Sequence, residues 1–563
     1  MSDDNITLSR RTLLGSLGAV GTAAAGAGLG TTAYFSDEES FTANSFTAGQ
    51  LDLAVGWETT YDGAGAVQTA AGTLDGSPAT LVDLADVKPG DSGSIELCVS
   101  ITDNPAYLWL GGELTSNAES GQNDAEAAAD LTDGSLGIDK GELGDAIEAT
   151  LSYDGGPTIE TGTLKSVVET LQFGVPLDAV PGTSGRDCYS STTGDCLVLE
   201  WAVPADVGNE IQSDSVGFGL QLFAQQCRHN DGTTNPTLDA VVTAGDSIQS
   251  AVDAASAGDV IGIEAGTFTE QVVVDESVVL TGAGQGATVI QSPSSLTSQF
   301  VRDTDDNYPV VTLAADGAAL WNCTVDGDRQ GSGNNVFVGV AAYNAAARVG
   351  RVEVTNVSED PLNGVQHGLG IFAYGDDGSD RSVVVDGCSV HDYQKGGVIG
   401  EGAGLDLCVF DSTITGIGQT DEIGQNGIQV SNVSQAAIAG NTVRDNYYTP
   451  SSQSAGIIVF QSSDVVIERN RILDNNNGIG ALSAGDTVAR RNNITGNDTG
   501  ALNLGASTFD VTHNWWGAAD GPSASTLYTG GATDIVTGAT ANGSGDAVFD
   551  AHWDPFATSP FDL

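Results

Sequence analysis

A short pattern recurs along the second half of the chain and constrains its fold more than any other feature. It consists of an apolar residue, two or three residues, a small polar residue or cysteine, one more residue, and a second apolar residue. Asn470, Asn492 and Asn514 occupy its polar position at intervals of 22 residues. Such repeats are typical of solenoids, in which each repeat forms one coil that is stable only against its neighbours. The polar positions of all the copies are Cys323, Thr355, Cys388, Ser412, Asn441, Asn470, Asn492 and Asn514.

The recurring asparagines predict a ladder inside the solenoid. Stacked coils of a parallel β-solenoid lie ~4.8 Å apart, so equivalent side chains of successive coils come into hydrogen-bonding contact. Regular spacing fits a ladder better than it fits a ligand site. We expect Cys323 and Cys388 to replace asparagine as small buried thiols in the same row. Together with Cys408 they make an odd number, so at least one of the three stays free unless it pairs outside this region.

The segment DSIQSAVDAASAGDVIGIEAGTFTEQ (246–271) resembles the entry to right-handed parallel β-helices of the pectin-lyase-like kind. Ile248, Val252 and Ala255 lie on one face of a predicted short helix, and after Gly258 the apolar period changes to two. The resemblance implies that this helix covers the open end of the first coil. NWWGAADGPS (514–523) resembles the closing coil of such proteins, followed by a tail that covers the other end.

The N-terminus carries Arg10-Arg11 before the Gly/Ala-rich stretch LGSLGAVGTAAAGAGLG, which resembles a twin-arginine export signal. We expect cleavage after Ala33, an extracellular or cell-surface location, and no membrane span after cleavage.

The next stretch, AYFSDEESFTANSFTAGQLDL (33–53), resembles the start of the TasA/camelysin family, whose members carry the SipW-cognate type of signal. The resemblance implies a jelly-roll-like β-sandwich and assembly in an extracellular or biofilm matrix. Its first strand is either the first strand of a monomeric sandwich or a strand that pairs with the edge of a neighbouring copy. The module has one histidine, His229, and no H-E-x-x-H motif, so we do not expect a metalloprotease.

These features together predict an all-β chain. We expect an export signal over 1–33, a jelly-roll-like β-sandwich over 34–235, and a right-handed single-stranded parallel β-helix with an N-terminal capping helix and a C-terminal cap over 236–563.

The charge of the chain is strongly acidic, with 18 Lys+Arg against 75 Asp+Glu and a net charge of −57. Molar salt screens such self-repulsion, so a high-salt, haloarchaeal origin is expected. Nucleic acid is an unsuitable partner because no basic face is visible.

Four cysteines of the first module, Cys98, Cys188, Cys196 and Cys227, are expected to form disulfides in an exported protein. Three pairings are open. Cys188 and Cys196 flank YSSTTGD, a plausible hairpin, so Cys188–Cys196 with Cys98–Cys227 is our first choice.

The extra length of the coils follows the same strand each time, so the loops are predicted to line an elongated groove on one side of the solenoid. The candidate catalytic residues there are Asp326, Asp328, Arg329, His391 and Lys395. The other candidate groove residues are Glu359, Asp360, His367, Asp392, Arg444 and Asp445. Another long loop nearby carries Asp376, Asp377 and Asp380.

Three functions fit this sequence. The first, which we prefer, is an exported surface or matrix protein whose β-helix presents a long face to extracellular polysaccharide and which can self-assemble through its first strand. The second is a hydrolase with paired carboxylates, or a lyase with a Lys or Arg base, acting on acidic polysaccharide as the pectin-lyase-like resemblance implies. The third is a passive spacer. No cofactor is predicted, although a lyase commonly uses Ca²⁺ to neutralise a uronate.

Overall fold

The computed structural model describes residues 51–563, except 64–65, 75–78, 120–122, 128–140, 184, 192–195, 333–335, 452–453, 506–507, 524–543, 550, 552 and 562. The predicted export signal and nearly all of the stretch that resembles the TasA/camelysin family lie outside these residues.

The chain divides into two compact units. The first comprises residues 1–115, 144–207 and 218–236, and the second comprises 116–143, 208–217 and 237–563. Two short stretches of the predicted sandwich therefore group with the second unit.

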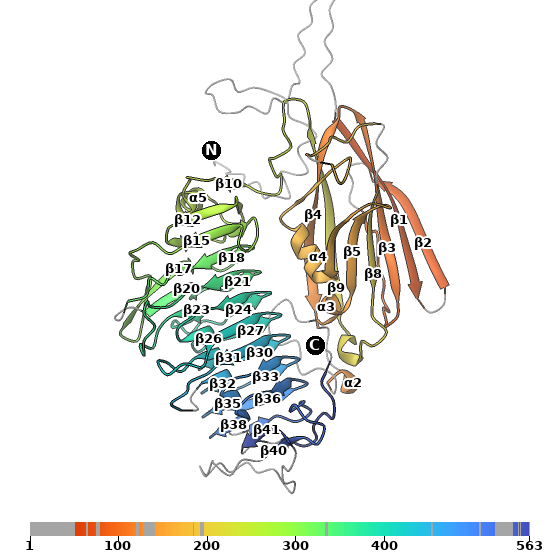
Figure 1. Ribbon diagram of the computed structural model, residues 1–563. Coiled ribbons are helices and arrows are strands. Elements are labelled where there is room, and N and C mark those ends of the chain that lie inside the picture. The colour runs from red at the N-terminus through yellow and green to blue at the C-terminus, as the bar shows by residue number, and fades with distance from the viewer. Residues whose placement is uncertain are drawn as a thin grey trace, which may run out of the picture. The chain divides into compact units, whose positions relative to one another are not determined.

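The first unit is built on two β-sheets, drawn red to yellow in Figure 1. The six-stranded antiparallel sheet runs in the order β2 (Ala66–Leu74), β1 (Leu51–Gly63), β3 (Ser92–Asp103), β8 (Cys196–Ala202), β5 (Glu148–Tyr153) and β6 (Thr158–Thr163). The smaller sheet contains β7 (Val175–Leu177), β4 (Ala106–Ala118) and β9 (Ser215–Gln226). Alternate strand residues such as Leu97, Leu199 and Leu110 are buried, as expected for strands with one core face.

Two disulfides join Cys98 to Cys196 and Cys188 to Cys227. Our first-choice pairing of Cys188 with Cys196 is therefore wrong. Cys98 and Cys196 are direct register partners on the neighbouring strands β3 and β8. The disulfide partners are therefore cysteines that lie close together in the folded sheet, and not the two that lie closest in the sequence.

The helices of the described residues are short. They are α2 (Asp124–Ala127), α3 (Leu143–Ala146), α4 (Leu164–Leu171), α5 (Ile248–Ala254) and the 3₁₀-helix η1 (Asn209–Ile211).

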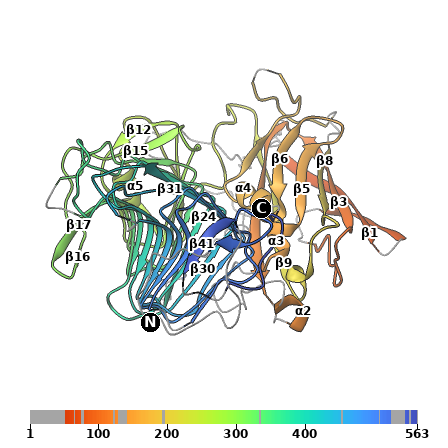
Figure 2. The same cartoon turned by 60° about the horizontal axis from the view of Figure 1, so that its bottom comes forward.

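The second unit contains a parallel β-helix of three long sheets, in which each coil contributes one strand to each sheet in turn (Figures 1 and 2). Sheet 1 contains β10 (Ala240–Val242), β11 (Val260–Ile263), β14 (Val279–Gly282), β18 (Ala318–Trp321), β21 (Ala347–Gly350), β24 (Arg381–Asp386), β27 (Leu405–Phe410), β30 (Gln435–Ala439), β33 (Val465–Glu468), β36 (Asp486–Arg490) and β39 (Thr508–Asp510).

Sheet 2 contains β12 (Gly266–Thr269), β15 (Thr288–Gln291), β19 (Thr324–Asp326), β22 (Glu353–Thr355), β25 (Ser389–His391), β28 (Thr413–Gly418), β31 (Thr442–Asn446), β34 (Arg471–Leu473) and β37 (Asn493–Thr495). Sheet 3 contains β13 (Val272–Val274), β17 (Asp305–Leu313), β20 (Val336–Tyr343), β23 (Leu369–Tyr374), β26 (Gly396–Glu401), β29 (Asn426–Ser431), β32 (Ala455–Phe460), β35 (Asn477–Leu482), β38 (Thr499–Leu504), β41 (Gly545–Phe549) and β40 (Pro522–Ser523), with β16 (Phe300–Arg302) paired to β17.

The core of this solenoid is a continuous column of inward-facing aliphatic side chains. Ile428, Ile457 and Ile479 are register partners in successive strands of sheet 3, and all three are fully buried. Each apolar residue thus packs on the same kind of residue in the coils before and after it, as in other stacked-repeat proteins.

The predicted asparagine ladder is present where sheet 1 turns into sheet 2. Asn441, Asn470 and Asn492 each donate a side-chain amide hydrogen bond to Oδ1 of the next asparagine, ending at Asn514, at 2.9 to 3.0 Å. The row continues towards the N-terminus through Ser412, whose amide donates to Asn441 Oδ1 at 3.0 Å.

Cys388 also belongs to this row, because its amide donates to Ser412 Oγ at 3.0 Å. Thr355 does not, because register pairs Thr324 with Glu353 and so places Val352 at the ladder position of that coil. Cys323 and Cys388 are buried and not disulfide-bonded, like Cys408, and burial raises the pKa of Cys388 to about 12.

A second ladder, which the repeat pattern did not predict, lies where sheet 2 turns into sheet 3. Asn446 Nδ2 donates to Asn475 Oδ1 at 3.1 Å, and Asn475 Nδ2 donates to Asn497 Oδ1 at 3.0 Å. Asn497 Nδ2 in turn donates to Asp546 near the C-terminal end of the solenoid. Two of the three corners are therefore fixed by buried amide bonds.

Both ends of the solenoid are covered, as predicted. At the N-terminal end, Ile248 and Val252 of α5 are buried in the solenoid core. At the other end, Trp516 is fully buried and Trp553 is nearly so. The tail is held there by Asn493, which exchanges two hydrogen bonds with the backbone of Phe561 at 2.8 and 2.9 Å.

The ladder predicts a large stability difference between a substitution in the ladder and one on the surface of the solenoid. Asn470→Ala removes the amide bonds to Ile438 O, Glu468 O and Asn492 Oδ1 and leaves the buried amide of Asn441 without its acceptor. We expect a loss of at least about 3 kcal/mol in the free energy of unfolding, since each buried unsatisfied group costs ~1–3 kcal/mol. Urea unfolding in molar salt measures it.

Thr413→Ala is the control, because Thr413 is exposed on the outer side of sheet 2. It is expected to change the free energy of unfolding by less than about 0.5 kcal/mol. Equal effects of the two substitutions would contradict a stabilising role for the ladder.

Candidate functional site

A hollow of about 600 Å³ opens on the outer side of sheet 3, near the ends of β23, β26, β29 and β32. The side chains that matter most for its chemistry are Tyr374, Asp376, Glu401, Gln429, Ser431, Asn432, Phe460, Arg302 and Asp303. Aromatic rings, carboxylates and amides thus share one concave surface, which is the general character of small-ligand sites.

A straight row of residues crosses this hollow. Tyr374, Glu401, Ser431 and Phe460 are register partners in four successive coils. Coil spacing of ~4.8 Å sets the distance from each to the next. An aromatic ring, a carboxylate, a hydroxyl and a second aromatic ring therefore stand in a line parallel to the solenoid axis. Glu401 and Phe460 are partly exposed, whereas Tyr374 and Ser431 are nearly buried.

The hairpin β16–β17 contributes Arg302 and Asp303 from a coil that lies two before that of β23. Arg302 Nε lies 3.2 Å from Glu401 Oε1, and the guanidinium also lies over the ring of Phe372 at 5.9 Å. Burial raises the pKa of Glu401, Arg302 opposes this, and Asp303 adds to it. Glu401 is therefore the carboxyl group of this hollow that can keep a proton to a higher pH than usual.

The hollow carries a negative balance of charge. Its lining includes one cation, Arg302, and three acids, Asp303, Asp376 and Glu401. A polyanion would meet like charge there, and repulsion between like charges in a partly buried site is costly.

The residues predicted from the sequence lie at the other end of the sheet 3 strands, where sheet 2 turns into sheet 3. None of the candidate catalytic or groove residues lines the hollow. Only Asp376, from the further loop that the sequence singled out, does so. The loops do project from one side, because the long connections link sheet 2 to sheet 3.

Asp326, Asp328 and Arg329 form a local turn at the end of β19. Asp326 Oδ1 accepts hydrogen bonds from the amide of Asp328 at 2.8 Å and from Asn356 Nδ2 at 2.9 Å. Arg329 Nε donates to Asn356 Oδ1 at 3.4 Å. These bonds stabilise the turn and tie it to the next coil.

Glu359 and His367 form a buried pair in the longest of these loops. His367 Nε2 lies 2.8 Å from Glu359 Oε1, and the histidine side chain is 3% exposed. Burial lowers the pKa of His367, although Glu359 opposes the shift. Asp360 follows in the same loop and is exposed.

Neither Lys395 nor Arg444 has the arrangement expected of a catalytic base beside a substrate-binding groove. Lys395 Nζ donates to the backbone oxygen of Gly424 at 2.7 Å, and burial lowers its pKa. Arg444 lies 3.4 Å from Asp445, and both are well exposed. Their catalytic and binding roles stay predictions.

His391 lies on the outer side of sheet 2 between two carboxylates. Its Nδ1 is 2.6 Å from Asp392 Oδ2, and its Nε2 is 3.1 Å from Glu353 Oε1. Burial lowers the pKa of His391, but the hydrogen bonds to Asp392 and Glu353 outweigh it and the net shift is upward. The imidazolium form is therefore favoured in the folded chain.

The sequence analysis missed Tyr374, Glu401, Gln429 and Phe460. Their positions in the strand pattern could have identified them. Each side chain faces outward from its strand, and the residues beside it in the strand are apolar and face inward, as in IFAYG (371–375) and IIVFQ (457–461). Acidic residues in loops were the basis of the predicted groove, but they are so abundant in this chain that they discriminate poorly between sites and ordinary surface.

One cluster in the described residues has the composition of a cation site. Carboxylate oxygens of Glu119, Glu142 and Asp214 lie within 4.8 Å of one another. Burial, followed by the charge of Glu119, raises the pKa of Asp214 to about 8. Ca²⁺ takes 6–8 oxygen ligands, so these three groups supply only part of a shell.

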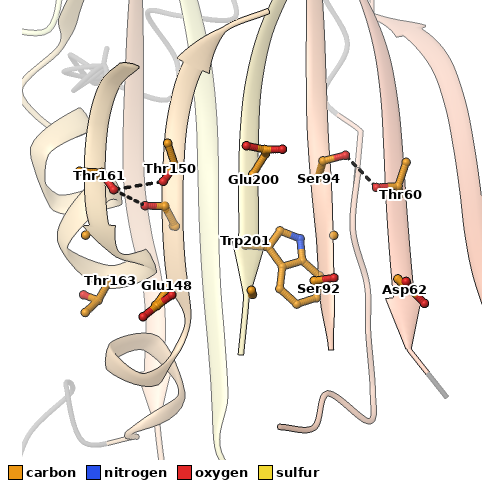
Figure 3. A pocket seen from close by; sticks show the side chains of 14 residues that line it. Thr60, Asp62, Ser92, Ser94, Glu148, Thr150, Thr161, Thr163, Glu200 and Trp201 are labelled. Carbon is orange, nitrogen blue, oxygen red and sulfur yellow. Dashed lines mark hydrogen bonds between the residues drawn. The ribbon is translucent and has the colours of Figure 1, made fainter. Parts of the chain in front are cut away.

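A second hollow, of about 820 Å³, lies on the six-stranded sheet of the first unit (Figure 3). Thr60 and Ser94 are 2.8 Å apart through their hydroxyls, and Thr150 and Thr161 are 3.1 Å apart. Glu200 lies between these two pairs in Figure 3. The hydroxyl groups already bond to one another, so we assign no chemistry to this face.

The comparisons with known proteins agree with the fold. The family described as right handed beta helix region matches residues 332–531, and the second unit is a right-handed parallel β-helix. No curated protein matches the sequence.

Solved structures of low identity are similar to parts of the chain. The A-module of mannuronan C-5 epimerase AlgE4 from Azotobacter vinelandii has a TM-score of 0.27 at 18% identity, over 47% of this chain and 75% of that one. Tailspike protein 2 from Escherichia coli O157:H7 bacteriophage CAB120 has a TM-score of 0.34 at 14% identity, over 47% and 35%. A family 28 exopolygalacturonase from Yersinia enterocolitica has a TM-score of 0.33 at 10% identity, over 73% and 79%. We draw no conclusion about activity from these values.

Within the described residues, no helix is long and apolar enough to cross a membrane.

The environment of His391 predicts a pH-dependent stability. Folding raises the pKa of His391 above its value of about 6.5 in the unfolded chain. The protonated histidine therefore stabilises the fold fully at pH values below about 6.5, and this contribution is lost as the pH rises through the pKa of the folded chain. We expect the unfolding midpoint of wild type to fall across that range at constant salt, and His391→Gln to remove this part of the fall. Urea unfolding at a series of pH values measures it, and parallel profiles would contradict the assignment.

Proposed function

We propose that the chain is an exported cell-surface or extracellular-matrix protein whose β-helix binds a polysaccharide along the outer side of sheet 3. One observation carries the proposal: a concave surface places the rings of Tyr374 and Phe460 on either side of Glu401 and Ser431 in one straight row.

The chemistry of sugar rings and their regular repetition along a polysaccharide both fit this arrangement. A pyranose has an apolar C–H face that packs on an aromatic ring, and hydroxyl groups that pair with carboxylates and amides. Gln429 and Asn432 add amides beside the row. A polymer of such rings presents the same two features repeatedly, and a solenoid presents its coils in the same way.

The charge of the hollow favours a neutral glycan. Three carboxylates against one guanidinium repel uronates and sulfated sugars unless a cation intervenes. We therefore propose a neutral polysaccharide as the ligand and keep acidic polysaccharide as the alternative to be tested.

Export is supported by observations in the first unit and at the N-terminus. Two disulfides are expected of an oxidising compartment. Arg10-Arg11 and the Gly/Ala-rich stretch after them resemble a twin-arginine signal, and residues 33–53 resemble the TasA/camelysin family. A haloarchaeal origin, and assembly through the first strand, belong to the same proposal.

A glycoside hydrolase is the second candidate function. Glu401 favours it, because a half-buried carboxyl with a raised pKa is suited to protonate a leaving oxygen. Asp303 and Asp376 line the same hollow and are the carboxylates available to activate water or to act as nucleophile.

Binding is tested by calorimetry in molar salt with two neutral polysaccharides, pullulan and linear mannan, and two acidic ones, polygalacturonate and alginate. We expect a neutral polymer to bind best. Phe460→Ala is expected to weaken binding about tenfold, since a lost ring contact costs ~0.5–1.5 kcal/mol beyond its area.

Phe410→Ala is the matched control, because Phe410 lies on sheet 1 and not in the hollow. It is expected to leave affinity unchanged. Binding of none of the four polymers would overturn the proposal and leave the passive spacer.

Hydrolysis separates the two candidate functions. If the chain is a hydrolase, new reducing ends appear with the bound polymer and are lost in Glu401→Gln, while that variant still binds. If the chain only binds, no new reducing ends appear over the same time with wild type.

A further inference from the structure

The hairpin β16–β17 lies over the outer side of sheet 3 beside the hollow. Figure 2 shows it projecting from the body of the solenoid. Its strands pair Phe300 with Asn307 and Arg302 with Asp305, and Arg302 and Asp303 line the hollow. The hairpin therefore forms a wall of the site.

The ring of Phe300 attaches this wall to the sheet. It stacks on Tyr343 with ring centroids 4.4 Å apart and on Tyr374 at 5.7 Å. The same cluster includes Phe372 and Val338, both fully buried. On the N-terminal side of the hollow, the face of sheet 3 is thus occupied by the protein itself.

The base of the hairpin is also fixed. Gln271 Nε2 donates to the backbone oxygens of Thr297 at 2.9 Å and Pro309 at 2.7 Å, and its Oε1 accepts from the amide of Thr297 at 2.9 Å. These bonds hold both ends of the insertion to the preceding coil. The wall is therefore a built part of the solenoid.

On the C-terminal side of the hollow, the same face of the sheet is partly exposed among the residues that the structure describes. Register continues the row from Phe460 to Leu482, and the adjacent row from Ile458 through Gly480 to Leu502. All four larger side chains are partly exposed. An apolar strip therefore leads away from the hollow along the solenoid axis.

From this asymmetry we infer that the site binds the end of a polysaccharide chain. The terminal sugar occupies the hollow against Arg302 and Asp303, and the following sugars extend over β29, β32, β35 and β38. An internal segment does not fit, because the continuing chain would have to pass through the space filled by Phe300 and its partners. This inference rests on the proposed function, and it specifies which part of the polymer is recognised.

The stoichiometry of binding tests the inference. Whichever neutral polymer, pullulan or linear mannan, binds better is separated into fractions of different mean length, and each is titrated with the full chain in molar salt. End recognition predicts one bound protein per chain at every length. Recognition of internal segments predicts a number of bound proteins that rises in proportion to length.

Two substitutions in the hairpin provide the structural control. Phe300→Ala removes the stacking that holds the wall, and we expect bound protein per chain to rise with length in this variant. Val301→Ala changes the neighbouring side chain, which is 50% exposed, and is expected to behave as wild type. Arg302→Ala leaves the aromatic stack intact and is expected to weaken binding about tenfold without changing the stoichiometry.

The outcomes distinguish this inference from the proposed function. Binding by wild type in proportion to polymer length would overturn end recognition and leave glycan binding in place. Absence of binding to both neutral polymers and to polygalacturonate and alginate would overturn both. One protein per chain for wild type and Val301→Ala, with more for Phe300→Ala, supports both.

Discussion

The parallel stacking of coils, fixed by amide hydrogen bonds at two corners, is the interaction on which the second unit depends. Asn441, Asn470 and Asn492 link successive coils at one corner, and Asn446 and Asn475 do so at the next. These bonds hold the coils from Cys388 to Asn514 in the same register. A one-residue slip in any strand would turn its side chains from the core to the surface. The outer rows of the sheets are therefore as regular as the buried column.

That regularity creates the candidate site. Tyr374 and Glu401 are far apart in sequence from Phe460, yet they stand in one line because each ends its strand of sheet 3. The hairpin at Phe300 covers the outer side of sheet 3 before this line begins, so within the described residues the line has a covered end and an exposed end. The proposed ligand recognition thus depends on the repeat and on the hairpin together.

Prediction from the sequence succeeded for features that repeat or have a local cause. The asparagine row and the capping helix each have a local pattern with a physical reason, and the closing coil was expected from the resemblance of NWWGAADGPS to such coils. It failed at Thr355, because a six-residue motif does not define register when Val352 fits the same place. The predicted disulfide pairing was also wrong, because Cys98 and Cys196 lie on neighbouring strands although they are 98 residues apart in the sequence. The second ladder repeats at the same intervals as the first, each asparagine five residues further on, so the sequence contained its pattern although it was not predicted. The hollow was missed because it depends on which side chains of successive coils meet.

The sequence by itself determined that the second half of the chain is a covered parallel solenoid, because periodic apolar residues and asparagines can bury themselves in few other ways. Only the tertiary structure showed which outer side of the solenoid carries a concave surface of mixed aromatic and polar side chains. Acidic residues occur almost everywhere in this chain, so their presence in a loop carries little information. The meeting of Phe300, Arg302 and Glu401 depends on how an insertion folds back over neighbouring coils, and no local pattern encodes that path.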